Sequence, residues 1–187
     1  MTLLSQKIAG LLTAAQEARI TTEAGTDLTL SLAGRTGEDD CGIYDTPGAF
    51  GNLPAGEAYI APLEGTAKGI LVYDASMGGV GLLAEPIRVT VKDGYAVKVE
   101  GGEEAAKLKA ILEKAGKNSG NIAELGIGTN AGARVTGSVL EDEKVLGTVH
   151  IALGDNANFG GEVDAECHLD GILSAPDLYF DNKMVMK

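Results

Sequence analysis

The chain has 187 residues and a mass of 19.1 kDa, and its 44% apolar residues and mean hydropathy of +0.07 predict a folded protein with a buried core. Its 27 acidic and 15 basic residues give a net charge of −12, which disfavours nucleic-acid backbones and anionic membranes as partners. The two cysteines, Cys41 and Cys167, are too few for a secreted disulfide framework and lack the paired spacing of a structural zinc site. No segment resembles a signal peptide or a membrane span, so we expect a cytoplasmic protein.

The first third of the chain predicts a helix and then a hairpin. Apolar residues recur at three- and four-residue spacing from Leu4 to Ala15, which indicates an amphipathic helix that ends near Arg19. Strand-like segments at 20–22 and 28–32 follow, joined by a turn at 24–26.

Residues 35–56 form the longest irregular stretch, and a loop of this length is more often functional than idle. Strand-like segments follow at 57–62 and 66–74. Alternating residues at 87–92 and 95–99 flank Asp93-Gly94, which is the strongest hairpin signal in the chain.

A second helix is predicted over Glu103 to Ala115, with acidic residues in its first turn and Gly116 as its stop. The last third reads as strands at 122–127, 148–153 and 167–173, one short helical turn at 141–144, and a final hairpin at 178–186. We therefore expect one α+β domain over residues 1–187, with a mostly antiparallel or mixed sheet and two principal helices.

The two histidines, His150 and His168, lie in neighbouring predicted strands. His168 and Asp170 are separated by one residue, so both side chains project from the same face of a strand and can hold one cation together. The alternative is a structural hydrogen-bonded pair. The hypothesis that His168 activates Cys167 as a nucleophile is excluded, because adjacent residues of a strand point to opposite faces of the sheet.

Glu124 is embedded in an apolar strand, where a carboxylate is rare unless it is paired or bound to a metal. Residues 126 and 128 on its own face are both glycine, which predicts an open surface that a ligand or a metal could approach. The position of Glu57, at the start of a strand, favours a solvent-exposed carboxylate. His150, taken alone, is typical of a histidine in a protein core. Together the five residues form a mixed nitrogen and oxygen ligand set suited to zinc, manganese, cobalt or iron: Glu57, Glu124, His150, His168 and Asp170.

Four ordered blocks carry a family resemblance: residues 51–62, 123–128, 147–154 and 167–171. They resemble the thermophilic metalloaminopeptidases of the aminopeptidase T and aminopeptidase S family, over nearly the whole chain. The resemblance implies a co-catalytic pair of divalent metals, zinc, cobalt or manganese, held by the five residues above. It also implies hydrolysis of small peptides at their N-termini and assembly as a homodimer.

The chain resembles only the C-terminal, metal-carrying part of that family, so either an N-terminal domain was removed, or it is a separate subunit, or the chain is a reduced homologue. Glu124 is predicted to bridge the two metals and to be the catalytic residue, and the charges of Glu57, Glu124 and Asp170 favour two metals over one. The mechanism implied is metal-assisted hydrolysis by an activated water. The family places a tyrosine after the block that contains His150, where this chain has Phe159.

Two alternatives stay open. The resemblance extends to ring-cleaving dihydroxypyridine dioxygenases, which implies a mononuclear non-haem iron enzyme that uses His150, His168 and Asp170 as a two-histidine, one-carboxylate triad. The chain could also be an inactive metal-binding or dimerisation domain.

Overall fold

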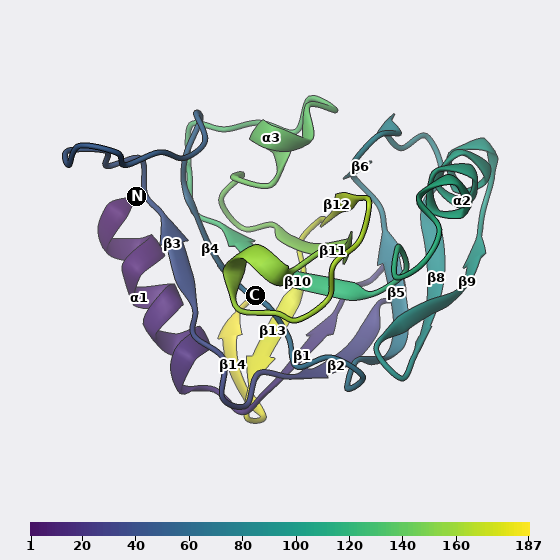
Figure 1. Ribbon diagram of the computed structural model, residues 1–187, viewed down its shortest axis with the longest axis horizontal. Coiled ribbons are helices and arrows are strands. Elements are labelled where there is room, and N and C mark those ends of the chain that lie inside the picture. Colours follow the sequence, from purple (N-terminus) through teal and green to yellow (C-terminus); the bar gives the residue numbers. More distant parts are fainter.

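The computed structural model describes all 187 residues and contains three α-helices, one short 3₁₀ helix and two seven-stranded sheets. Every strand pairing within the sheets is antiparallel. Figure 1 shows the sheets in the middle of the molecule, with α1 at one side and α2 at the other. The predicted α+β class, with mostly antiparallel strands, is confirmed.

The first sheet has the strand order β14-β13-β1-β2-β5-β8-β9. Its strands are β1 (Glu17–Thr21), β2 (Asp27–Ser31), β5 (Lys68–Tyr73), β8 (Ile87–Lys92), β9 (Tyr95–Glu100), β13 (Asp177–Phe180) and β14 (Lys183–Met186). Buried residues alternate with less buried ones along β8, so one face of this strand packs against the core.

The second sheet has the strand order β3-β4-β10-β11-β12-β6-β7. Its strands are β3 (Glu38–Asp40), β4 (Glu57–Ile60), β6 (Ser76–Met77), β7 (Gly81–Leu82), β10 (Ile122–Gly128), β11 (Val149–Gly154) and β12 (His168–Leu173). Every residue of β10 and β11 is buried, so both faces of these two central strands are covered.

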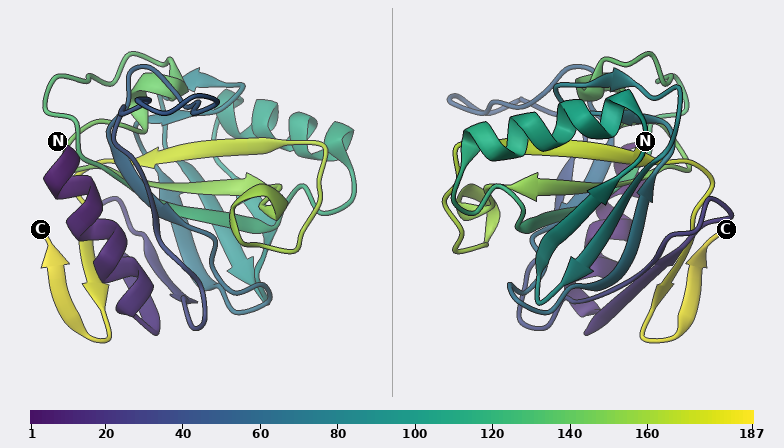
Figure 2. Two further views of the ribbon diagram at one scale, coloured as in Figure 1. Left: turned by 60° about the vertical axis from the view of Figure 1, so that its left-hand side comes forward. Right: turned by 90° about the vertical axis from the view of Figure 1, so that its right-hand side faces the viewer.

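The helices are α1 (Thr2–Ala14), α2 (Glu103–Ala115) and α3 (Val139–Asp142), and the 3₁₀ helix spans Ala157–Phe159. Helix α1 packs beside β3 and β4, as the left view of Figure 2 shows, and α2 lies over β8 and β9, as the right view shows. The predicted end of the first helix near Arg19 is wrong. Ala15 is already extended, and from Glu17 the chain pairs with β2 and β13, so sheet pairing on both sides overrides the helical pattern.

The predicted hairpins are present, including the one that turns at Asp93-Gly94, and α2 has the predicted bounds. Strand β3 was missed, because its sequence of three acidic residues has no apolar alternation. It pairs with β4 at the edge of the second sheet, within the stretch that the sequence marked as irregular.

One buried apolar cluster takes residues from both sheets and from α1 and α2. The phenol of Tyr73, on β5, donates a hydrogen bond to the Ile151 carbonyl on β11 at 3.2 Å and so joins the two sheets. The hydroxyls of Ser5 and Thr129, 2.7 Å apart, join α1 to the end of β10. None of the helices has the length and apolar character needed to span a membrane.

Candidate metal centre

The strand register brings the predicted site residues to one face of the second sheet. Glu124 on β10 and Asp170 on β12 both lie opposite Ala152 of β11, and residues opposite one another in antiparallel strands share a face. His150 lies opposite Gly126, and Glu57 lies opposite Gly128. The positions between these functional side chains are small residues, which leaves room for the long ones.

The predicted open surface beside Glu124 is filled by the protein itself, which corrects the sequence interpretation. A Cβ atom at Gly126 would lie 1.9 Å from Nε2 of His150, so this glycine makes room for the imidazole. A Cβ atom at Gly128 would lie 2.0 Å from the Val145 carbonyl oxygen, so this glycine lets the segment after α3 lie against β10.

Glu57, His150 and Glu124 form a continuous row of contacts. Nε2 of His150 lies 3.2 Å from Oε2 of Glu57 and 3.2 Å from Oε1 of Glu124. His150 is fully buried, and Glu57 is only 6% exposed, so the interpretation of Glu57 as a solvated strand end is wrong.

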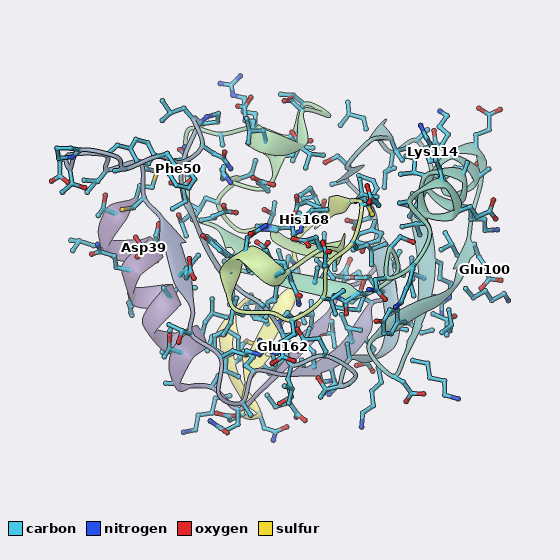
Figure 3. The ribbon with its side chains drawn as sticks, viewed as in Figure 1. Asp39, Phe50, Glu100, Lys114, Glu162 and His168 are labelled. Atoms are coloured by element: carbon cyan, nitrogen blue, oxygen red, sulfur yellow. The ribbon has the colours of Figure 1, made fainter.

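His168 and Asp170 continue this row, as their spacing on one strand predicts. Nε2 of His168 lies 3.3 Å from Oε2 of Glu124 and 3.3 Å from Oδ1 of Asp170. Nδ1 of His168 lies 2.7 Å from the Asp155 carbonyl oxygen. A carbonyl can only accept a hydrogen bond, so Nδ1 carries a proton and Nε2 is directed at the two carboxylates. Figure 3 shows His168 near the middle of the molecule, far from Glu100 at the edge of the first sheet.

Sequence reasoning missed two members of the cluster, Glu143 and Lys144. Lys144 is fully buried, and its ammonium donates hydrogen bonds to Oε1 of Glu57, at 2.5 Å, and to Oε1 of Glu143. A run of charges after a short helix usually lies in solvent, so the local sequence gave no signal for their burial. We call the seven residues the site cluster: Glu57, Glu124, Glu143, Lys144, His150, His168 and Asp170.

The cluster shifts the pKa values of its members strongly. Burial opposes protonation of His168, but hydrogen bonds and charges from Asp170 and Glu124 outweigh it and raise its pKa to about 11. The pKa of His150 is also raised well above its usual value, since the hydrogen bonds to Glu124 and Glu57 outweigh burial. Burial opposes ionisation of Asp170, yet His168 lowers its pKa to about 2. The carboxylates therefore favour positive charge between them, from a proton or from a divalent cation.

Two overlapping groups of ligand atoms could hold a metal ion. Glu57, Glu124 and His150 form one group, and Glu124, His168 and Asp170 form the other; within each group the atoms lie within 4.8 Å of one another. Glu124 belongs to both groups. The triad of His150, His168 and Asp170 expected for a mononuclear iron site is not one of these groups, because Glu124 takes the place of His150. Carboxylate and imidazole donors suit a divalent ion such as iron or manganese.

A cavity of about 710 Å³ is lined by the whole second group and also by Glu57 and Glu143. Phe159 forms part of its wall, edge to face with His168 on one side and with Tyr59 on the other, each with ring centroids 5.7 Å apart. The Tyr59 phenol donates a hydrogen bond to Glu38, 3.1 Å away, and burial raises its pKa, so Tyr59 stays neutral. The cavity lining includes no lysine or arginine.

Comparison with known proteins identifies the family. A family model described as 2,5-dihydroxypyridine 5,6-dioxygenase (NicX) matches residues 5–187. The chain belongs to this family. A 2,5-dihydroxypyridine 5,6-dioxygenase from Pseudomonas putida KT2440 is 27% identical over 191 residues, which cover 94% of this chain and 54% of that protein. The solved structure of 2,5-dihydroxypyridine dioxygenase from Pseudomonas putida KT2440 matches with a TM-score of 0.86 and 25% identity, over 97% of this chain and 56% of that chain.

Membership of the dioxygenase family corrects the prediction of an aminopeptidase, and the chain is not classed as a hydrolase or metallopeptidase. The structure of AmpT from Thermus thermophilus matches with a TM-score of 0.74 and 20% identity, over 97% of this chain and 53% of that chain, which shows a shared fold alone. The four blocks behind the prediction contain β4 and β11, most of β10 and the start of β12, and alone they do not distinguish hydrolysis from oxygen chemistry. Phe159, in place of the expected tyrosine, was the residue that departed from the aminopeptidase pattern.

Proposed function

We propose that this chain carries the metal centre of a dioxygenase that cleaves a dihydroxylated pyridine or a closely related ring. The observation that carries the proposal is the group Glu124, His168 and Asp170 at the cavity, in a member of the 2,5-dihydroxypyridine 5,6-dioxygenase family. The chain spans about half the length of the relatives it matches, so the activity of the complete relatives is proposed for it, on the strength of this site.

Iron is the metal that we propose for this group. The fit depends on His168, whose Nδ1 proton is held by the Asp155 carbonyl so that Nε2 is available beside two carboxylate oxygens. When bound, ferrous iron supplies the redox chemistry that allows dioxygen to react with an aromatic ring. The sequence interpretation assigned the same ligands to a pair of zinc, cobalt or manganese ions. We do not propose that pair.

The side chains around the cavity favour a flat, uncharged ring. Phe159 and Tyr59 offer aromatic surfaces next to His168, and aromatic rings pack well edge to face or offset. The lining carries carboxylates from β3, β4 and the site cluster and no basic side chain, so a substrate with a carboxylate would be repelled. A hydroxylated pyridine meets this requirement, and the carboxylates can accept a proton from its hydroxyl group.

Three further expectations remain proposals. The homodimer and the additional N-terminal domain or subunit follow from the family resemblance. The two cysteines are free thiols, which supports a reducing compartment such as the cytoplasm.

Oxygen consumption tests the proposed function. The chain is loaded with Fe²⁺ without air, mixed with 2,5-dihydroxypyridine, and followed in an oxygen electrode. We expect one O₂ consumed per ring lost and both atoms of ¹⁸O₂ recovered in the product. Asp170→Asn should abolish the uptake, because it removes one ligand charge, while Asp177→Asn on β13 should not. A folded, iron-loaded chain that consumes no oxygen with this ring contradicts the proposal.

A further inference from the structure

A buried lysine is the most unusual feature of the site cluster. Lys144 has no exposed surface, and lysine is almost never fully buried unless it is paired. Its ammonium lies between Glu57 and Glu143, and neither carboxylate has more than 9% of its side chain exposed. The ammonium is therefore a fixed positive charge inside the protein and does not belong to the surface.

The backbone around Lys144 holds it in this place. The carbonyl of Lys144 accepts a hydrogen bond from the Asn130 amide at 2.8 Å, and the Leu146 amide donates one to the Asn130 carbonyl at 3.1 Å. Gly128 lets this segment approach β10, because a Cβ atom there would lie 2.8 Å from the Lys144 carbonyl carbon. These backbone contacts hold the Lys144 main chain close to β10, where its side chain reaches Glu57.

The two groups of ligand atoms differ in what their carboxylates already contact. In the first group, Oε1 of Glu57 accepts from Lys144, which leaves only Oε2, the oxygen that faces His150. In the second group, neither Glu124 nor Asp170 contacts a lysine or an arginine. The first group therefore already contains a positive charge, the ammonium of Lys144. The second group has no lysine or arginine, so a bound proton or metal ion must provide its positive charge.

The charge balance also favours a metal ion in the second group of ligand atoms over one in the first. Glu124 and Asp170 together carry two negative charges, which one divalent ion balances. A second divalent ion at Glu57 would stand close to the ammonium of Lys144, and two like charges in a buried site repel strongly.

We propose that Lys144 occupies the place of a second metal ion and restricts the site cluster to one divalent ion, held by Glu124, His168 and Asp170. The inference rests on the proposed function for the existence of a metal centre and adds the residue that sets the number of ions. Lys144 is thus a positioning residue, which acts on the metal through Glu57 and contacts neither substrate nor metal.

Metal counting tests the inference without any measurement of turnover. The chain is loaded with Mn²⁺, freed of excess ion, and analysed for manganese by mass spectrometry and by electron paramagnetic resonance. The wild type should hold about one ion with the signal of isolated Mn²⁺. Lys144→Met keeps the length of the side chain and removes its charge, so it should hold about two ions with a magnetically coupled signal. Lys98→Met, at an exposed pair with Glu100, is the matched control and should hold about one ion.

Lys144→Gln keeps a hydrogen-bond donor near Glu57 and Glu143 without the charge, so it should also hold about two ions and tests the inference if Lys144→Met does not fold. Glu57→Gln leaves Lys144 paired with Glu143, and because Glu57 is not a ligand of the single ion, the content should stay at about one ion. Two ions in the wild type, one ion in folded Lys144→Met or Lys144→Gln, or loss of the ion in Glu57→Gln would each overturn the inference and leave the metal centre standing. No ion in the folded wild type would refute the proposed function as well.

Discussion

The two sheets place their charged residues in opposite ways. In the first sheet, Arg19 and Asp27 pair at 2.8 Å across β1 and β2, but both side chains are more than half exposed. In the second sheet, Lys144 and His150 are fully buried among carboxylates. Exposed pairs contribute little to stability, whereas a buried charge must be matched by partners. The first sheet is therefore a scaffold with a polar surface, and the second carries a charged site inside it.

Removal of one carboxylate from the second sheet should have the largest effect on metal affinity and turnover, whereas removal of one from the first sheet should have none. Glu124→Gln removes the residue shared by both groups of ligand atoms while it keeps the shape of the side chain. We expect metal affinity to fall by more than about 100-fold and turnover to be lost, with the fold kept. Glu17→Gln on β1 is the control in the first sheet and should change neither. Unchanged metal content in Glu124→Gln would show that the site is misplaced.

The stability of the metal-free protein should depend on pH through the second sheet. Burial, together with the charges of Asp170 and Glu57, raises the pKa of Glu143 to about 8. The folded protein therefore binds this proton more tightly than the unfolded chain. The stability it contributes is full below the ordinary carboxyl pKa and is lost as the pH rises through 8.

Glu143→Gln isolates this effect, because glutamine stays neutral. Between pH 5 and pH 9 the wild type should lose on the order of 3 kcal/mol of unfolding free energy relative to the variant. Urea denaturation in the presence of a chelator measures the difference at each pH. Parallel pH profiles for the two proteins would contradict the raised pKa.

A pair of glycine substitutions compares the two sheets directly. Gly126→Ala places a methyl group against the His150 imidazole, and Gly69→Ala places one 2.1 Å from the Asp27 carbonyl oxygen in the first sheet. Each should cost about 2 kcal/mol of stability, because the neighbouring atoms must move. Only Gly126→Ala should also weaken Mn²⁺ binding, by about 10-fold, since it displaces a histidine that contacts Glu124. Equal metal affinity in the two variants would count against the role of His150.

The smallest effect should come from the cavity wall. Phe159→Ala removes the ring that lies between Tyr59 and His168. We expect KM for the ring substrate to rise by about 10-fold with a smaller change in kcat, because one aromatic contact is lost. Tyr95→Ala, at an exposed position on β9, is the matched control and should leave both constants unchanged. An unchanged KM in Phe159→Ala would place the substrate elsewhere in the cavity.

Local patterns in the sequence predicted much of the fold and part of the site. The turn at Asp93-Gly94 and the helix that ends before Gly116 follow from short-range preferences. The shared face of His168 and Asp170 follows from the strand period of two.

Lys144 and Glu57 could not be placed in this way, because their burial depends on packing between distant segments. Lys144 belongs to a run of charges, and its burial depends on contacts with distant residues such as Gly128, Asn130 and Glu57. The choice between hydrolysis and oxygen chemistry also lay beyond the local sequence, since carboxylate and imidazole ligands hold metals in both kinds of enzyme.

A divalent metal ion at Glu124, His168 and Asp170 is the feature on which the proposed chemistry depends. Anomalous scattering from a crystal grown with Mn²⁺ and measured on both sides of the manganese edge tests it most directly. We expect one strong peak within coordination distance of these three side chains and none beside Lys144. Peaks confined to surface carboxylates, with none at His168, would contradict it.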